Sequence, residues 1–298
     1  MHIFIQVVLP VLLIFGAGFA IQKWKKVDIK PVSVVALYVA TPALVFQTFH
    51  EAEIDGQYLL MVVFAFALLF SLILFNKILA KAFGKSEKKE SGWILSTAFM
   101  NAGNYGAPII LFAYGQEGFA YAVSFMVLQS IIMNVFGVYY AAKGYAGARY
   151  ALKSILSMPV TYALLLAVFF QMMPFSMPEN LMGSIDIVAA SAIPLVMIIL
   201  GMQLANMELG HFDWPSVSYG VTVRLFVSPF IAYVLTVILP VDPLLAKVLI
   251  VSAAMPSAAT IVMMAVQFDN QPKYVSSVTL VSTLLSVITI TVLLTILN

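Results

Sequence analysis

The sequence contains no cysteine and has few charged residues for its length. The absence of Cys excludes disulfide bonds, thiolate metal sites and thiol nucleophiles. Only 15 Lys and Arg and 13 Asp and Glu occur in 298 residues, whereas 62% of the residues are hydrophobic. A soluble protein of this length needs about a quarter of its residues charged. The composition therefore excludes a soluble enzyme or nucleic-acid reader and indicates a membrane protein.

The motifs of membrane-embedded enzymes are also missing. Proteolysis in the bilayer needs a Ser/His pair or two embedded Asp residues, and zinc hydrolysis needs a cluster such as His-Glu-x-x-His. The sequence shows neither, and His2, His50 and His211 fall at the terminus or at loop edges. We therefore expect no enzymatic activity, no metal, no cofactor and no nucleic-acid partner.

Apolar segments long enough to cross a bilayer, about 20 residues each, recur along the whole chain. Cutting the sequence at its polar clusters predicts ten membrane-spanning helices, near residues 3–22, 31–50, 57–78, 92–114, 118–142, 157–175, 184–206, 215–239, 243–267 and 273–297. The connections between them are short. We expect an all-α polytopic membrane protein without a soluble domain.

Positive charges lie in only one of the two alternating sets of loops. One set holds Lys23, Lys25, Lys26, Lys30, Lys77, Lys81, Lys85, Lys88, Lys89, Lys143, Arg149, Lys153 and Lys273. The other set holds only acidic charges, at Glu51, Glu53, Asp55, Glu117, Glu179 and Asp242. Because Lys and Arg mark cytoplasmic loops, we expect both termini on the non-cytoplasmic side.

Ten helices divide into two halves of five, residues 1–153 and 154–298. An odd number of helices per half makes the second half enter the membrane from the opposite side, which is an inverted repeat. Three proline pairs recur at nearly constant spacing: Pro10 with Pro159, Pro108 with Pro256, and Pro42 with Pro194. Proline is common in membrane helices, so the pairs alone could be chance. The topology argument does not depend on them.

The predicted fourth and ninth helices carry residues that interrupt a helix. Helix 4 contains Asn101-Ala102-Gly103-Asn104-Tyr105-Gly106-Ala107-Pro108, and helix 9 contains Met255-Pro256-Ser257 followed by Thr260. One interpretation is two ordinary proline kinks. The other is a pair of crossed half-helices whose positive N-terminal ends, near residues 104–108 and 255–257, face an anion.

Arg224 lies about 13 Å into the predicted eighth helix, counted from Pro215 at 1.5 Å per residue. An unpaired guanidinium at that depth is costly, at about 2.5 to 3.5 kcal/mol. Two partners remain open for it. The carboxylate of a transported anion could bind it in bidentate fashion, or the carbonyl groups freed at the helix breaks could accept its hydrogen bonds.

Helices 4, 5 and 9 contain no Asp or Glu that could carry a coupling cation. A sodium site built from neutral oxygens stays open, with Gln129, Asn134, Thr260 and Gln267 available. The sequence therefore leaves proton coupling, sodium coupling and uncoupled transport as alternatives.

The helix 4 motif from Asn101 to Pro108, together with Ala254-Met255-Pro256-Ser257-Ala258, resembles the auxin efflux carrier family over essentially the whole chain. The resemblance implies a fold similar to bile acid transporters and sodium/proton antiporters. It implies a scaffold of helices 1, 2, 6 and 7, a moving transport domain of helices 3–5 and 8–10, and dimers formed through the scaffold. Asn101, Asn104, Pro108 and Pro256 fall on its motif positions.

We therefore expect a secondary transporter of small organic anions in a bacterial inner (plasma) membrane, working by elevator-type alternating access. Malonate, malate and similar carboxylates are the substrate class that the resemblance implies. The predicted substrate site consists of Asn101, Asn104, Tyr105, Gly106, Pro108, Arg224, Pro256 and Ser257. The alternatives are a sodium-coupled bile acid-type carrier, a carrier of auxin-like aromatic carboxylates, and an anion channel.

Overall fold

The computed structural model describes residues 2–52, 55–142, 153, 156–173, 177–206 and 213–297, and these residues form helices and no strands. Several predictions fall outside the described ranges, among them the loop charges Glu53, Lys143 and Arg149, and His211. The predicted boundary between the two halves, at residues 153 and 154, adjoins such a range as well.

Contacts between residues group the chain into two compact units. Unit 1 comprises Met1–Ile54, Gly103–Val127 and Ser154–Asn206. Its helices are η1 (Phe4–Val8), α1 (Leu9–Lys25), α2 (Ile29–Val35), η2 (Ala36–Ala40), α3 (Thr41–Glu51), η3 (Ala102–Gly106), most of α6 (Ala107–Ile132), α9 (Pro159–Gln171) and α10 (Glu179–Asn206). The η elements are π-helical turns, in which hydrogen bonds span five residues.

Unit 2 comprises Asp55–Ala102, Leu128–Lys153 and Met207–Asn298, so the division falls within α6. Its helices are α4 (Gly56–Ala82), α5 (Glu87–Ala98), η4 (Met133–Gly137), α7 (Val138–Ala141), α11 (Trp214–Thr222), η5 (Val223–Val227), α12 (Ser228–Ile238), α13 (Pro243–Ala253), α14 (Ala259–Gln267) and α15 (Pro272–Leu297).

Among the described residues, seven helical stretches are long and apolar enough to cross a membrane. They are Phe4–Lys25, Ile29–Glu51, Gly56–Ala82, Ala102–Ala141, Glu179–Asn206, Trp214–Ile238 and Pro272–Leu297. Six of them match predicted spans to within a few residues. The count is lower than the predicted ten because Pro159–Gln171 and Pro243–Ala253 are short, and because one stretch of 40 residues covers parts of two predicted spans.

The 40-residue stretch changes direction at Gly115, close to the predicted connection between spans 92–114 and 118–142. Gly115 has φ 67° and ψ −162°, a conformation that L-residues with a Cβ rarely adopt. The chain thus turns where the sequence placed a loop, although helical hydrogen bonding continues on both sides of the glycine.

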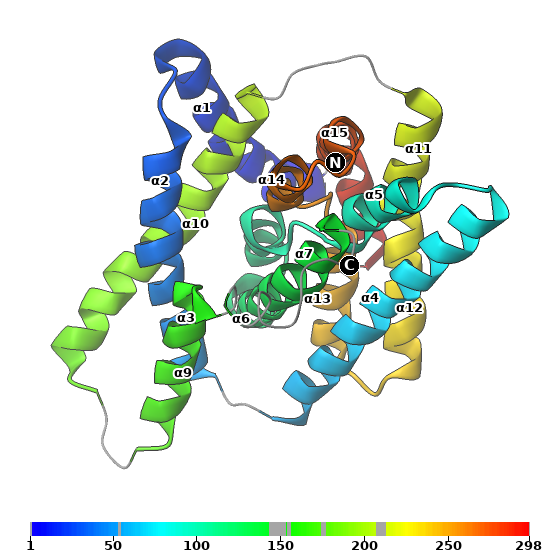
Figure 1. The fold of residues 1–298 in the computed structure, drawn as a ribbon. Coiled ribbons are helices and arrows are strands. Elements are labelled where there is room, and N and C mark those ends of the chain that lie inside the picture. The colour runs from blue at the N-terminus through cyan, green and yellow to red at the C-terminus, as the bar shows by residue number, and fades with distance from the viewer. Residues whose placement is uncertain are drawn as a thin grey trace. The chain divides into compact units, whose positions relative to one another are not determined.

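In unit 1, α1 and α10 pack closely through two glycines. A Cβ added at Gly18 would overlap the carbonyl oxygen of Ile198, and one at Gly201 would overlap that of Phe15. Small residues that let helix backbones approach are typical of membrane helix interfaces. Figure 1 shows α10 beside α1, and α3 beside α9, in agreement with their contacts.

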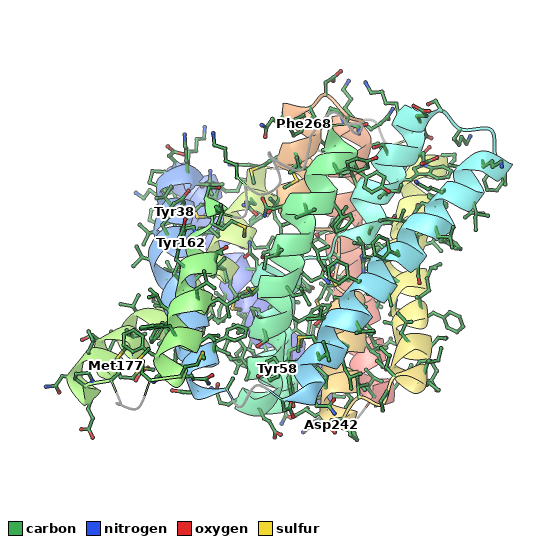
Figure 2. The ribbon with its side chains drawn as sticks, turned by 60° about the horizontal axis from the view of Figure 1, so that its bottom comes forward. Tyr38, Tyr58, Tyr162, Met177, Asp242 and Phe268 are labelled. Atoms are coloured by element: carbon green, nitrogen blue, oxygen red, sulfur yellow. The ribbon has the colours of Figure 1, made fainter. Side chains whose placement is uncertain are left out.

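In unit 2, α4 packs against α5 and α12, α12 packs against α13, and α15 packs against α5 and α11. Figure 2 shows Phe268 at one end of this unit, with Tyr58 and Asp242 at the opposite end. At the Phe268 end, Lys88 pairs with Asp269 at 3.4 Å and Lys89 with Asp213 at 3.5 Å. At the other end, the Asp242 amide donates to the side-chain oxygen of Gln57 at 2.9 Å.

Four of the five π-helical turns in the described ranges end two residues before a proline, at Pro10, Pro42, Pro108 and Pro229. A proline ring clashes with the carbonyl four residues back and lacks an N–H. The residues before Pro10, Pro42 and Pro229 instead donate to the carbonyl five residues back. The wider turn accommodates the ring, so these helices continue through their prolines.

We predict that Gly18→Ala lowers the thermal stability of the protein, because the new methyl group would push α1 away from the backbone of α10. Overpacking of this kind costs about 1 to 3 kcal/mol. The matched control is Gly16→Ala on the same helix, where a Cβ meets nothing within 4 Å. The melting temperature in detergent is the measurement, and equal effects of the two substitutions would contradict this packing.

Candidate binding site

Two helices of unit 2, α5 and α13, stop inside the protein, and helical structure resumes a few residues later in each case. α5 ends at Ala98, Phe99 has extended φ/ψ values of −114° and 111°, and helical structure resumes at Ala102. α13 ends at Ala253, and α14 begins after Ala258, which has φ −68° and ψ 133°. The predicted interruptions of the fourth and ninth helices are thus present as non-helical segments of a few residues each. They are not proline kinks.

The two interruptions pair with each other. The Asn101 amide donates to the Pro256 carbonyl at 2.8 Å, and the Ala258 amide donates to the Phe99 carbonyl at 3.1 Å. Met100 and Ser257 therefore face each other in an antiparallel bridge. Non-helical backbone at membrane depth needs protein partners, and here each break supplies them to the other.

Side chains bind the carbonyl groups that the interruptions release. The Ser257 hydroxyl donates to the Ser96 carbonyl at 2.6 Å, and the Ser257 amide donates to the Ser282 hydroxyl at 3.3 Å. The Ser228 hydroxyl donates to the Ala253 carbonyl at 2.8 Å. All five residues are buried, so the carbonyl groups of Ser96 and Ala253, near the ends of α5 and α13, have partners within the protein.

Arg224, in η5, is fully buried beside these helix ends. Its Nη1 donates to the Thr97 carbonyl at 2.6 Å. Its Nη2 donates to the Ser228 hydroxyl at 2.5 Å and also to the Ala253 carbonyl. The sequence left two possible partners for Arg224, a transported carboxylate and the freed carbonyl groups. The structure shows the contacts with the carbonyl groups. Contact with a transported carboxylate stays a prediction.

Nε of Arg224 has no hydrogen-bond partner in the described part of the chain. The ion pairs found there are Lys88 with Asp269 and Lys89 with Asp213, so no carboxylate neutralises this guanidinium. A buried cation without a carboxylate is unusual, because burial of an unpaired charge is costly. The carbonyl dipoles at the two helix ends are its observed compensation.

The first break lies earlier in the sequence than predicted. The sequence placed the new helix start near residues 104–108, whereas helical structure resumes at Ala102. Asn104, Tyr105 and Gly106 belong to the turn η3, and Pro108 is the second residue of α6. The predicted start was a few residues too late, because the wide η3 turn lets helical structure begin before Pro108 and continue through it.

The predicted substrate residues have different surroundings. Asn101, Pro256 and Ser257 are buried in the paired segments, whereas Asn104 is partly exposed. Tyr105 is buried and its ring lies 5.2 Å from that of Phe15, both in unit 1. Gly106 and Pro108 are also buried. Asn101 is therefore the member that combines burial with a side-chain amide at the break itself.

The candidate ion ligands are placed on three elements. Gln129 is buried in α6, Thr260 is partly exposed near the start of α14, and Asn134 lies in the turn η4, where its amide donates to the Ser130 carbonyl at 2.9 Å. Within the described ranges, no group of three or more His, Cys, Asp or Glu could hold a metal ion. An ion site from neutral oxygens stays a prediction.

Sequence reasoning missed a buried polar network next to Arg224. Asn76 donates to the Thr97 hydroxyl at 2.9 Å and accepts from the Tyr219 hydroxyl at 2.9 Å. The Thr97 hydroxyl in turn donates to the Trp93 carbonyl at 2.7 Å. An Asn in the otherwise apolar α4 was the available indication. The pairing with Tyr219 depends on a contact across 143 residues, which the sequence does not encode locally.

Comparison with known proteins identifies relatives of the whole chain. The sequence pattern of the membrane transport protein family matches residues 3–146 and 148–294. An uncharacterized transporter of Methanothermobacter thermautotrophicus is 26% identical over 270 residues, covering 88% of this chain and 87% of the relative. An uncharacterized transporter of Methanocaldococcus jannaschii is 25% identical over 301 residues, covering 96% of both chains.

Proposed function

Because the chain belongs to the membrane transport protein family, that of the auxin efflux carriers, we propose that it is a secondary transporter of small organic anions. Malonate, malate and similar short carboxylates are the proposed substrates. They bind at the paired breaks of α5/η3 and α13/α14, at Asn101, Asn104, Tyr105, Gly106, Pro108, Arg224, Pro256 and Ser257. The antiparallel pairing of the two interrupted helices is the observation that carries the proposal.

The electrostatics of the breaks favour an anion. Helical structure begins again at Ala102 and at Ala259, and each helix start carries a positive partial charge of about half an elementary charge. The sequence has no Asp or Glu between residues 91 and 116 or between 243 and 268. Because these two segments carry no carboxylate of their own, their helix starts can attract a negatively charged ligand.

Ten helices in two inverted repeats are part of the proposal, and the packing supports them. In an inverted repeat, helix 1 corresponds to helix 6 and helix 2 to helix 7. The contact of α1 with α10 then corresponds to the contact of α9 with α3, and both are present. In the same way, α4 packs on α5 as α12 packs on α13. Each half therefore repeats the neighbours of the other.

We predict that Asn101→Ala and Asn104→Ala each weaken carboxylate binding, because each removes an amide from the proposed site. Loss of a hydrogen bond to a charged group corresponds to about a 10- to 100-fold loss of affinity. The measurement is uptake of labelled malonate, malate and related acids into proteoliposomes, with proton, sodium and voltage gradients imposed separately. Saturation and counterflow distinguish a carrier from a channel, and the gradients identify the coupling ion.

The matched control for the two asparagine variants is Asn180→Ala, which removes an exposed amide near the start of α10. This variant is expected to transport like the parent protein. If both site variants also insert, fold and transport like the parent, the crossover is not the substrate site. If the parent takes up no carboxylate of the panel, the proposed substrate class is wrong.

We also propose elevator-type movement, in which helices 3–5 and 8–10 move against a dimeric scaffold of helices 1, 2, 6 and 7. The division into units supports it in part: unit 1 contains helices 1, 2, 6 and 7, and unit 2 contains helices 3 and 8–10. Residues 103–127, which the proposal assigns to the moving helices 4 and 5, cluster with unit 1 instead.

Because the chain lacks Cys, spin labels can be introduced at chosen pairs of sites. We predict that a pair at Ile187 and Ile238, both exposed, changes its distance distribution when substrate and gradient are added. A pair at Leu74 and Ile238, both within unit 2, is expected to keep its distribution. An unchanged first pair in an actively transporting protein would contradict elevator movement.

The proposed location is the inner (plasma) membrane, with both termini outside the cytoplasm. Contacts between loops support the alternation: the loop before α5 meets those before α11 and α15 through Lys88 and Lys89, and Gln57 meets Asp242. In unit 1, Gln22 at the end of α1 meets Asn206 at the end of α10, and Gln171 donates to the Ala52 carbonyl at 2.5 Å. Each of these contacts joins two loops or helix ends that the predicted topology places on the same side of the membrane.

Single cysteines test this topology directly. We predict that Glu179→Cys reacts with a membrane-impermeant maleimide added to intact cells, because the acidic loops are proposed to lie outside. Lys85→Cys is expected to react only after the membrane is permeabilised. Both residues are exposed in the structure. The reverse pattern of labelling would show the opposite orientation.

A further inference from the structure

The carboxyl ends of α5 and α13 meet at a single cation. The last four carbonyl groups of a helix lack partners within that helix. Of those at the two ends, the Thr97 carbonyl receives Arg224 Nη1 at 2.6 Å, and the Ala253 carbonyl receives Arg224 Nη2. Thr97 and Ala253 are 156 positions apart in the sequence. One side chain thus bridges the carboxyl ends of the two interrupted helices.

The charges at this junction are matched. Each helix carboxyl end carries about −0.5 elementary charge, so the two ends together carry about −1. The guanidinium of Arg224 carries +1 and has no carboxylate partner in the described part of the chain. Its full burial removes solvent screening, which strengthens the interaction with both ends. The negative ends of α5 and α13 are therefore neutralised by Arg224.

We propose that Arg224 is a positioning residue that ties the ends of α5 and α13 together and cancels their negative charge, which leaves the positive starts at Ala102 and Ala259 unopposed and makes the crossover prefer anions. The part of this inference that concerns ligand preference rests on the proposed carrier function. In this role Arg224 acts through the main chain, because Nη1 and Nη2 donate to the carbonyls of Thr97 and Ala253. The role is separate from the direct contact with an anion proposed above.

The surroundings of Arg224 are built to hold this geometry. The Ser228 hydroxyl accepts from Nη2 and donates to the same Ala253 carbonyl. Thr97, whose carbonyl accepts from Nη1, has its hydroxyl held by Asn76 from α4. Two nitrogens of a planar guanidinium reach two carbonyls at once, whereas the single ammonium nitrogen of Lys is a point charge on a flexible stem. Charge and geometry can therefore be separated by substitution.

Amide hydrogen exchange of the purified protein without substrate tests the bridging role. The amides of Asn101 and Ala258 form the hydrogen bonds between the two breaks, so their protection reports on whether the breaks stay paired. In Arg224→Gln, we expect exchange at these amides to be about 10- to 100-fold faster, as for loss of hydrogen bonds to a charged group. In Arg224→Lys, we expect an intermediate increase.

Asn270→Ala provides the matched control. Asn270 is fully buried in unit 2 and donates to the carbonyls of Tyr140 and Ala141 at the end of α7 and to the Ser91 hydroxyl near the start of α5. It carries no charge, and these contacts lie at the ends of α5 and α14 that face away from the breaks along the chain. This variant is expected to lower the melting temperature without faster exchange at Asn101 and Ala258. Equal exchange at the breaks in Asn270→Ala and Arg224→Gln, or parent-like exchange in Arg224→Gln, would overturn the bridging role.

Uptake of labelled malonate and malate then tests the charge. Arg224→Gln is expected to raise the KM for these anions by about tenfold or more, Arg224→Lys to restore most of that loss, and Asn270→Ala to leave the KM unchanged. If Arg224→Gln does not fold, Arg224→Lys alone tests the proposal. Faster exchange at Asn101 and Ala258 together with a nearly normal KM would show that the charge of residue 224 acts separately from its geometry. A KM in Arg224→Lys no better than in folded Arg224→Gln would overturn the role of the charge.

The two arms of the experiment fail separately. If the parent protein takes up neither anion, the proposed substrate class is wrong. Hydrogen exchange at Asn101 and Ala258 then still tests whether Arg224 bridges α5 and α13. If the parent transports them and exchange at Asn101 and Ala258 does not respond to Arg224→Gln, the bridge has failed and the proposed carrier function stands.

Discussion

Backbone hydrogen bonding where water is scarce is the constraint on which the rest of this structure depends. A helix that stops inside an apolar protein leaves carbonyl and amide groups that must find partners within the protein. Here two helices, α5 and α13, are interrupted side by side. Their non-helical segments pair with each other through the antiparallel bridge between Met100 and Ser257. The carbonyls of Ser96, Thr97 and Ala253 are bound by Ser257, Arg224 and Ser228. Each interruption thus supplies hydrogen-bond partners to the other.

This arrangement also makes the charges at the two breaks unequal. The carboxyl ends of α5 and α13 meet a buried guanidinium, whereas the segments 91–116 and 243–268, which contain the starts at Ala102 and Ala259, hold no Asp or Glu. A positive potential then remains on the side of the helix starts, which suits an organic anion. The proposed carboxylate site depends on this asymmetry of charge.

The sequence predicts much of this fold, and the failures have physical causes. Apolar length and charge clusters located six spans to within a few residues, because hydropathy and bilayer thickness are properties of short windows. The interruptions were also predictable, since Asn, Gly and Pro cluster there. Their register was not: the break at Phe99–Asn101 is set by pairing with Pro256–Ala258, and Pro108 is accommodated by the turn η3. The partner of Arg224 required the same long-range pairing, and the roles of Asn76 and Asn270 depend on contacts distant in sequence.

The central claim is that the paired breaks bind organic anions. Its most direct test is calorimetric titration of the purified protein with malonate, malate and related acids, each compared with its uncharged amide of nearly equal size. We predict saturable binding of at least one acid, an affinity for its amide at least about tenfold lower because the helix starts attract the charge, and weaker binding of the acid in Asn101→Ala. Equal affinity for an acid and its amide, or acid binding that Asn101→Ala leaves unchanged, would contradict it.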